Sequence, residues 1–166
     1  MSEMGSNMYS GVDIGAWNQP FTTGVTDKSA VVKRSVNSVK EIMKAAETFG
    51  ITFAVEVVNR YESSLVNTAK EAMAYVDMVD SPNCKILLDT YHMNIEEDSF
   101  ADAIRLVGDR LGHFHVGESN RRPPQADGRI QRDEITGALK EIHYHGADVM
   151  AQFLTMGGQV GRDTKH

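Results

Sequence analysis

Three residues of the kind that bind metal ions lie at or near the end of short apolar segments of the chain. Glu56 ends the segment TFAVE, Asp89 follows the segment CKILL, and His115 lies in the segment LGHFHV. One such carboxylate is most simply explained by an ordinary salt bridge, but three ligand-type residues at equivalent positions are much less expected by chance. Two carboxylates and one imidazole suit a hard or borderline divalent cation such as Mn²⁺, Co²⁺ or Mg²⁺. We therefore predict a divalent metal site formed by Glu56, Asp89 and His115.

A second polar residue follows each of these three within six positions. The companions are Glu62, His92 and Arg121. We expect all three on loops, from which their side chains can reach over a bound metal ion and bind hydroxyl groups. Taken singly they have simpler explanations, since His92 fits a turn and Arg121 beside Arg122 fits a solvated pair.

Alternation of apolar residues predicts the strands that position these side chains. Phe53, Val55 and Val57 occupy every second position of residues 52–58, which is typical of a strand with one side against covering helices. Glu56 then points to the opposite face. Further strands are expected at residues 8–14, 84–90, 111–116 and 148–154.

Apolar residues spaced by three and four predict four helices between the strands. They are expected to begin near Lys28, Ser63, Asp98 or Ser99, and Asp133. Strict alternation of strands and helices predicts an α/β fold in which helices cover a parallel sheet. Because the carboxyl ends of parallel strands meet at one edge, Glu56, Asp89 and His115 should lie together.

Composition excludes several classes of function. The 166 residues are 41% hydrophobic and 24% charged, which fits one globular domain over residues 1–166. The net charge of −6 without a basic block argues against a nucleic-acid partner. No apolar stretch approaches the roughly 18 residues of a membrane span, and no targeting segment is recognised, so we expect no membrane partner and a cytoplasmic location. Cys84 is the single cysteine, which excludes an internal disulfide and a cysteine-based zinc site.

Three strings make the pattern specific. VEVVNRYE, LLDTYHMNIEE and HFHVGESNRRPP resemble the ketose 3-epimerase family, the D-tagatose and D-psicose (allulose) 3-epimerases, among the xylose-isomerase-like barrels. The similarity runs from about residue 5 to the final GGQVGRD. It implies part of a (β/α)8 TIM barrel, a divalent metal held by Glu56, Asp89, His115 and a further glutamate, and substrate contacts from Glu62, His92 and Arg121.

The resemblance also implies a reaction. A free ketose would be epimerised at C3 by proton transfer through a cis-enediolate, with Glu56 as one acid/base group and a second glutamate on the opposite face. A carbon acid beside a ketone is too weak for a carboxylate alone at pH 7, so a metal ion must stabilise the developing charge. Inversion of the carbon needs acid/base groups on both faces.

Two features depart from the family pattern. Ala151 stands after Met150, where the family places its fourth ligand, and strand alternation turns the neighbouring Gln152 to the other face unless a bulge intervenes. Barrels of this type need about 250 residues, so the resemblance matches this chain to the third through seventh strands. Five parallel strands leave two open edges, and we therefore expect a homo-oligomer.

Three functions follow from these observations. The first is a metal-dependent ketose 3-epimerase whose small-molecule substrate is a ketose sugar. The second is a barrel fragment that binds a metal or sugar without catalysis. The third, a phosphodiester-cleaving relative acting on abasic DNA, is disfavoured by the acidic charge and by the shortage of histidines at strand ends.

Overall fold

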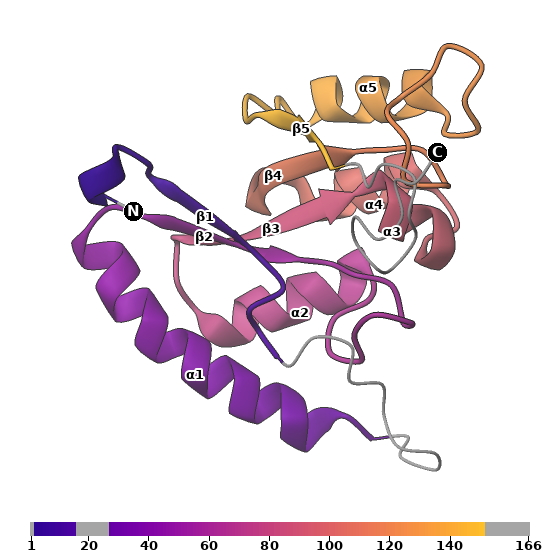
Figure 1. Ribbon diagram of the computed structural model, residues 1–166. Helices are drawn as coiled ribbons and strands as arrows, with labels where there is room; N and C mark the ends of the chain where they lie inside the picture. Colours follow the sequence, from indigo (N-terminus) through magenta and orange to yellow (C-terminus); the bar gives the residue numbers. More distant parts are fainter. Residues whose placement is uncertain (1, 16–26, 152–166) are drawn as a thin grey trace, which may run out of the picture.

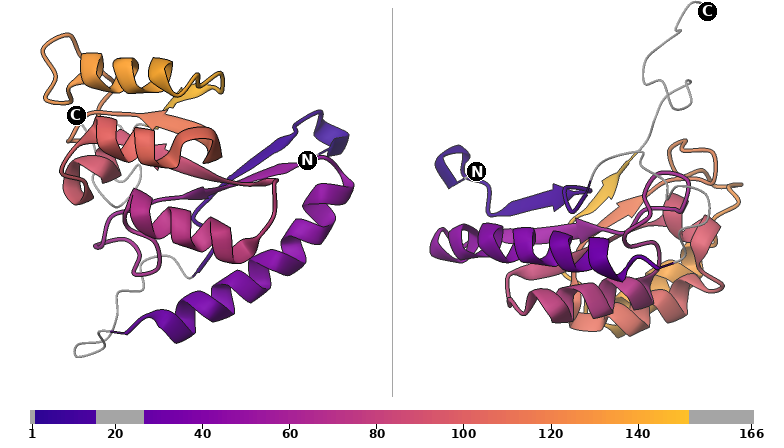
Figure 2. Two further views of the ribbon diagram at one scale, coloured as in Figure 1. Left: turned by 180° about the vertical axis from the view of Figure 1, so that it is seen from behind. Right: turned by 90° about the horizontal axis from the view of Figure 1, so that it is seen from below.

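The computed structural model describes residues 2–15 and 27–151, which form a five-stranded parallel sheet with helices on one face (Figure 1). The strands are β1 (Met8–Gly11), β2 (Thr52–Glu56), β3 (Cys84–Asp89), β4 (Leu111–Val116) and β5 (Asp148–Met150). Each strand pairs with its neighbours in the sequence, in the order β1-β2-β3-β4-β5. The sheet curls into an open half-barrel with the helices outside it (Figure 2). The predicted parallel α/β sheet is thus confirmed.

Five α-helices cover the sheet within the described residues. They are α1 (Ser29–Thr48), α2 (Ala69–Val79), α3 (Thr90–Glu96), α4 (Phe100–Val107) and α5 (Arg132–Glu141). Helix α1 buries Val36, Val39 and Met43, which lie three and four positions apart and therefore share one face. Two short 3₁₀ turns, η1 (Ser2–Met4) and η2 (Gly108–Arg110), complete the regular elements. None of these helices has the length and apolar character required to cross a membrane.

The start of α2 differs from the sequence prediction. Ser63 does not cap the helix; the Oγ1 of Thr68 does, by accepting a hydrogen bond from the N–H of Glu71 at 3.2 Å. Residues 57–68 form a loop instead, because the side-chain amide of Asn67 donates to the carbonyls of Val58 and Ser63 at 2.7 and 2.8 Å. These local hydrogen bonds compete with helix formation.

Four further elements were predicted with wrong boundaries or not at all. Helix α3 was missed, although Asp89 supplies an N-cap signal by accepting from the N–H of Tyr91 at 2.8 Å. The expectation that His92 lies on a loop was therefore wrong, because this helix contains it. Asp133 lies inside α5 rather than before it, since the N-cap position is Gln131. Strand β1 ends at Gly11, and β5 ends at Met150; residues 152–154 of the expected last strand lie outside the described residues.

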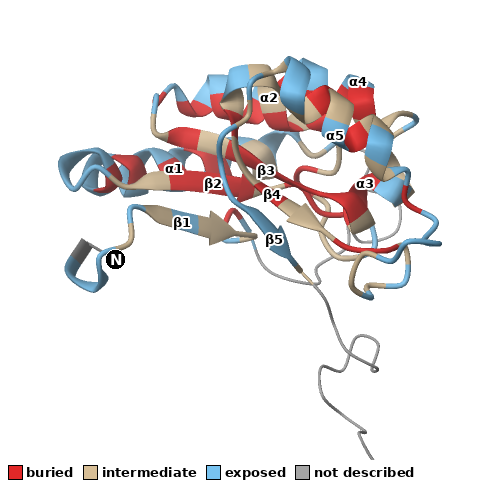
Figure 3. Ribbon diagram, turned by 90° about the horizontal axis from the view of Figure 1, so that it is seen from above, coloured by how far each residue is buried: buried red, intermediate tan, exposed pale blue. Residues whose placement is uncertain are grey.

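The core lies between the sheet and its helices. Phe53 and Val55 of β2 and Ile86 and Leu88 of β3 are buried there against the helices. Figure 3 shows the buried residues between the two layers. Side chains alternate between the faces of a strand, so Glu56 emerges on the other face. The expected orientation of β2 is confirmed.

One irregularity in β4 changes this alternation. Ile86 pairs with Leu111, whereas Leu87 pairs with His113, so Gly112 is an extra residue at this point of the ladder. An extra residue of this kind is a β-bulge, and it moves the following side chains to the other face.

The bulge decides which side chains of β4 face the helices. Leu111 and Phe114 lie three positions apart, yet both are buried in the core. His115 therefore lies on the opposite face of the sheet. A Cβ atom at Gly112 would come within 2.5 Å of the Cβ of Lys85, so only glycine fits without displacement.

Candidate functional site

The ends of three neighbouring strands bring the predicted metal ligands together. Asp89 at the end of β3 pairs in register with His115 of β4, and Glu56 ends the adjacent β2. The Nδ1 atom of His115 lies 3.5 Å from an Asp89 oxygen and 3.8 Å from a Glu56 oxygen. The three residues therefore form a cluster on the inner face of the half-barrel.

The donor atoms of this cluster fit a divalent cation. The Nδ1 of His115 is buried and makes no hydrogen bond to any residue within the described ranges. A buried ring nitrogen that faces two carboxylates without a hydrogen bond is costly unless a further group satisfies it. Two carboxylate oxygens and one imidazole nitrogen are suitable ligands for Mn²⁺, Co²⁺ or Mg²⁺.

Burial also shifts the charge states of the two carboxylates. It raises the pKa of Glu56 to about 7, an effect that His115 opposes and Asp89 reinforces. Burial acts to raise the pKa of Asp89 as well, but neighbouring His115 and the N–H of Tyr91 hold that pKa below its usual value. A cation bound between the carboxylates would favour the ionised form of both.

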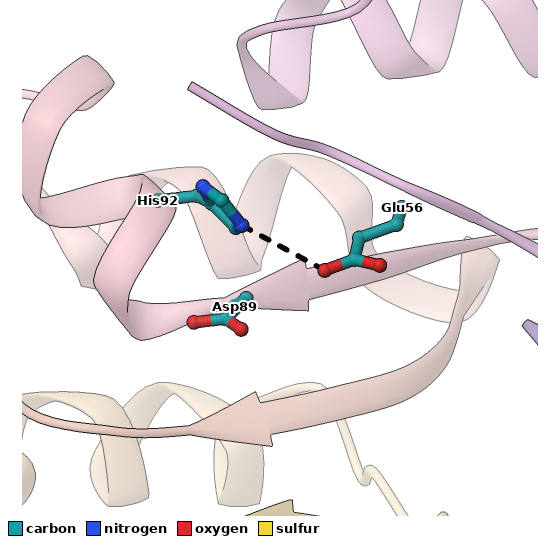
Figure 4. Close-up of side chains that lie close together, drawn as sticks. All are labelled: Glu56, Asp89 and His92. Carbon is teal, nitrogen blue, oxygen red and sulfur yellow. Dashed lines mark ion pairs between the residues drawn. The ribbon is translucent and has the colours of Figure 1, made fainter. Parts of the chain in front are cut away.

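A second histidine also approaches the carboxylates. Figure 4 shows His92 beside Glu56 and Asp89. One potential ligand atom from each of the three residues lies within 4.8 Å of the others. Its Nε2 lies 3.7 Å from a Glu56 oxygen. Burial lowers the pKa of His92, which favours the neutral ring.

The remaining predicted companions lie next to His92. An Nη atom of Arg121 donates to Glu62 at 2.6 Å and lies 3.4 Å from the Nε2 of His92. The guanidinium also sits over the ring of Tyr91, 4.0 Å from its centre, where a cation–π interaction is favourable. Glu62, His92 and Arg121 thus form one polar surface beside the carboxylates.

Arg121 holds an uncommon backbone conformation. Its φ angle is 59°, in the left-handed region that non-glycine residues rarely adopt. Its N–H donates to the carbonyl of Glu118, and the N–H of Glu118 donates to the carbonyl of Arg122. These bonds fix the turn that carries the guanidinium.

The loop after β4 is built around one buried carboxylate. Glu118 is 4% exposed and accepts hydrogen bonds from the N–H groups of Gln125, Arg129 and Ile130. Gly128 lies against this carboxylate, because a Cβ there would come within about 3 Å of three Glu118 atoms. Glu118 therefore organises the loop that carries Arg121.

The loop after β2 is held by an ion pair. The guanidinium of Arg60 binds both oxygens of Glu96 at 2.6–3.0 Å, and the N–H of Arg60 donates to the same carboxylate at 2.7 Å. This joins the loop of Glu62 to the end of α3, about one turn beyond His92.

Two residues at the site were not predicted from the sequence. Asn59 contacts both His92 and Glu62, and Thr90 binds the backbone after His115. Asn59 had a detectable signal, since a polar residue stands between the two glutamates of VEVVNRYE. Thr90 had none, because its partner is distant in the sequence.

Position 151 directly follows β5, the strand that pairs with the strand of His115. Val149 of β5 pairs with His115, so alternation places Ala151 on the same face and Met150 on the other. A methyl group has no ligand or acid/base atom to add there. Gln152, the neighbouring candidate, lies outside the described residues.

Known proteins are similar to this chain in sequence. Residues 5–156 match the family described as xylose isomerase-like TIM barrel. The chain is 49% identical over 149 residues to a D-psicose 3-epimerase of Ruminiclostridium cellulolyticum, an alignment covering 90% of this chain and 50% of the relative. It is 44% identical over 162 residues to a D-psicose 3-epimerase of Enterocloster bolteae, covering 98% and 52%. The chain therefore spans about half the length of these relatives.

Similar structures agree with the sequence matches. A crystal structure of D-psicose 3-epimerase with D-tagatose from Clostridium cellulolyticum superposes with a TM-score of 0.86 at 47% identity. The match covers 93% of this chain and 53% of that one. The half-barrel thus corresponds to part of a complete TIM barrel, which confirms the predicted fold class.

Proposed function

The chain belongs to the xylose isomerase-like TIM barrel family, and from this we propose that its site binds a divalent metal ion and a ketose and moves the proton at C3 of that sugar. The names of its relatives, D-psicose 3-epimerases, support this substrate class. The observation that carries the proposal is the buried Nδ1 of His115, which faces Glu56 and Asp89 without a hydrogen bond among the described residues.

We assign metal binding to Glu56, Asp89 and His115, with Mn²⁺, Co²⁺ or Mg²⁺ as the ion. When bound, the ion supplies stabilisation of the negative charge that develops as a proton leaves carbon beside a ketone. Glu56 is the acid/base residue on one face of the sugar. Burial raises the pKa of Glu56 to about 7 before a cation binds, and a bound cation would favour the ionised carboxylate, which is the form that accepts a proton.

Glu62, His92 and Arg121 are assigned to substrate binding. They offer a carboxylate, an imidazole and a guanidinium on one polar surface beside Glu56. Hydroxyl groups both donate and accept hydrogen bonds, so a sugar can pair with all three. Fixed hydrogen bonds of this kind would orient C3 toward the carboxylate of Glu56.

Ala151 favours a second candidate function, in which metal and sugar bind without epimerisation. Its methyl group provides neither a fourth ligand nor an acid/base group for the opposite face of the sugar. Loss of one such group typically slows proton transfer by about 10²- to 10⁴-fold. We therefore expect slow or undetectable epimerisation, while Glu56 still exchanges the proton on its own face.

The decisive experiment uses the full chain with D-fructose, D-psicose and D-tagatose, with and without Mn²⁺ or Co²⁺. Epimerisation and deuterium incorporation at C3 are measured together. Epimerisation supports the enzyme, incorporation without epimerisation supports transfer on one face, and binding without incorporation supports the non-catalytic function. Glu56→Gln is the control, because it keeps the shape and removes the base. Absence of both metal and ketose binding would refute the proposal.

We also propose that the chain self-associates. Within the described residues, β1 and β5 each pair with one strand only, and Met150 on β5 is 61% exposed. Unpaired strand edges are templates for pairing with another chain. Light scattering at tens of micromolar tests this, and a stable monomer would contradict it.

A single domain over residues 1–166 and a cytoplasmic location stay predictions from the sequence.

A further inference from the structure

We infer that Asn59 is a positioning residue that keeps the proton of His92 on Nε2, so that His92 faces the site as a hydrogen-bond donor and leaves metal binding to His115. The inferred role in the site rests on the proposed function. The position of the proton does not, because it follows from the hydrogen bonds around the ring.

The orientation of the Asn59 side chain is determined by a neighbouring backbone group. The N–H of Tyr61 donates to Oδ1 of Asn59 at 2.9 Å. A backbone N–H can only donate, so this atom is the amide oxygen. The amide nitrogen therefore points the other way, where it lies 2.8 Å from Nδ1 of His92 and 2.9 Å from Oε1 of Glu62.

Two donors then converge on one nitrogen of His92. Besides the amide nitrogen, the backbone N–H of Asn59 donates to the same Nδ1 at 3.1 Å. A proton on Nδ1 would face two N–H groups in a buried site, since both side chains are about 1% exposed. Nδ1 is therefore the acceptor, and the proton of the neutral ring lies on Nε2.

The contacts of Nε2 have to be weighed against this assignment. Arg121, which is also a donor, lies 3.4 Å from Nε2, and an oxygen of Glu56 lies 3.7 Å away. The contact with Arg121 exceeds the usual length of a hydrogen bond, whereas both contacts at Nδ1 fall within it. The shorter contacts at Nδ1 determine the tautomer.

The two histidines near the carboxylates consequently have different roles. A nitrogen that carries a proton has no lone pair for a cation, so His92 presents an N–H to the site. His115 presents a buried nitrogen that accepts no hydrogen bond from the described residues. Although Glu56, Asp89 and His92 also form a compact ligand set, the hydrogen bonds favour His115 as the ligand.

Asn59 acts on a second residue at the same time. Oε1 of Glu62 accepts hydrogen bonds from both the side-chain amide of Asn59 and the guanidinium of Arg121. One buried amide thus orients two of the three residues assigned to the sugar. Its replacement should disturb both.

The first test is nitrogen NMR of the full chain labelled uniformly with ¹⁵N, together with Asn59→Asp. In the parent we expect His92 in the Nε2-protonated form, with a coupling across the hydrogen bond from the N–H of Asn59. Aspartate has the same shape but replaces a donor by an acceptor beside Nδ1 and Glu62, so Asn59→Asp should place a proton on Nδ1. A His92→Gln spectrum identifies the resonances.

Asn67→Asp is the matched control. Asn67 lies in the same loop and donates from its amide to two backbone carbonyls, without touching His92. It should destabilise the loop but leave the His92 resonances unchanged. An Nδ1-protonated His92 in the parent, an unchanged tautomer in Asn59→Asp, or an equal change in Asn67→Asp would each overturn the inference.

The second test is independent of whether the Asn59 variant folds. Mn²⁺ affinity is measured by calorimetry for His92→Gln and His115→Gln. Loss of a residue that only supports a metal ligand typically weakens binding by about 10- to 100-fold. We expect His115→Gln to weaken Mn²⁺ binding by more than this range. His92→Gln should change affinity by less than about 10-fold, below that range. The reverse order would overturn the inference. Neither test requires a ketose, so a chain that neither binds a ketose nor exchanges its C3 proton would count against the proposed function without affecting this result.

Discussion

The hydroxyl of Thr90 donates to the carbonyl of Gly117 at 2.7 Å and accepts from the N–H of the same residue at 2.8 Å. Thr90 follows Asp89, and Gly117 comes two residues after His115. One buried side chain thus joins the ends of the two strands that carry these predicted ligands. The spacing between Asp89 and His115 depends on this contact as well as on the strand ladder.

Replacement of Thr90 tests that dependence. Thr90→Val keeps the shape but leaves both backbone groups of Gly117 without their partner. An unsatisfied buried polar group costs about 1–3 kcal/mol, so we expect a loss of this order in the free energy of unfolding. Urea denaturation measures it, with Thr90→Ser as the control that keeps the hydroxyl. Equal stability of the valine and serine variants would contradict the interpretation.

The bulge at Gly112 provides a prediction about strand β4. In Gly112→Ala the new methyl group meets the Cβ of Lys85 at 2.5 Å, so the strand must shift. Overpacking of this kind costs about 1–3 kcal/mol, and displacement of His115 should also weaken Mn²⁺ binding. Thermal unfolding and calorimetry check both effects.

Gly137→Ala is the matched control for this substitution. It lies within α5, and a Cβ atom there has no neighbour within 4 Å among the described residues. Alanine is favoured over glycine inside a helix by about 0.5–1 kcal/mol, so this variant should be more stable than the parent. Stabilisation by both substitutions would contradict the close approach of Lys85 to position 112.

The metal site is tested by Asp89→Asn. Asparagine caps helices as well as aspartate does, so the hydrogen bond to the N–H of Tyr91 at the start of α3 should survive. The negative charge is lost, and we expect Mn²⁺ affinity to fall by more than about 10-fold. Calorimetry measures the affinity, with exposed Asp127→Asn as the control. Equal affinity in parent and Asp89→Asn would show that the site is wrongly assigned.

Position 151 tests the missing acid/base group. Ala151→Glu adds a carboxylate on the face of His115. There it can act as a metal ligand and as the acid/base group on the side of the sugar opposite Glu56. We expect the rate of epimerisation to rise, at most by the factor that acid/base catalysis typically supplies, about 10²- to 10⁴-fold. Met150→Glu places the same charge on the other face and should have no effect. Full activity in the parent chain would show that another residue fills this role.

The pH dependence of stability is predicted for the pair of Arg60 and Glu96. Hydrogen bonds from Arg60 hold the pKa of Glu96 below its usual value, although burial of the carboxylate opposes this. A lowered folded-state pKa stabilises the protein above the unfolded pKa of about 4.3, and this contribution is lost as pH falls through the folded value. The stability difference between the parent and Glu96→Gln should therefore be largest near pH 7 and shrink below about pH 4.

A double-substitution cycle isolates this effect. In an Arg60→Ala background, Glu96→Gln should no longer change the pH dependence of unfolding. Denaturation measured between pH 3 and 7 decides the question. A difference that persists without Arg60 would assign the shift to another group.

Much of the site was predictable because its signals are local. An apolar residue at every second position marks a strand, and alternation with helices makes the sheet parallel, so the ends of β2, β3 and β4 had to meet at one edge. Glu56, Asp89 and His115 were expected there for that reason. The sequence strings also determined the family, which the match over residues 5–156 confirms.

Helix boundaries were less predictable, because several polar residues offer equivalent caps. Ser63 and Thr68 can both cap a helix, and the choice of Thr68 depends on the hydrogen bonds that Asn67 makes with its loop. Energies of about 1 kcal/mol separate such alternatives. Local sequence therefore does not decide between them.

Only the tertiary structure determined the contacts between residues that are distant in the sequence. Strict alternation along β4 would place His115 on the same face as Leu111, against the helices. The bulge at Gly112, where β4 packs on Lys85, places His115 in the site instead. Asn59 and His92 are 33 positions apart, and their hydrogen bond determines which ring nitrogen carries the proton. A sequence specifies which groups are present, but the direction of a lone pair depends on the neighbours that folding brings to it.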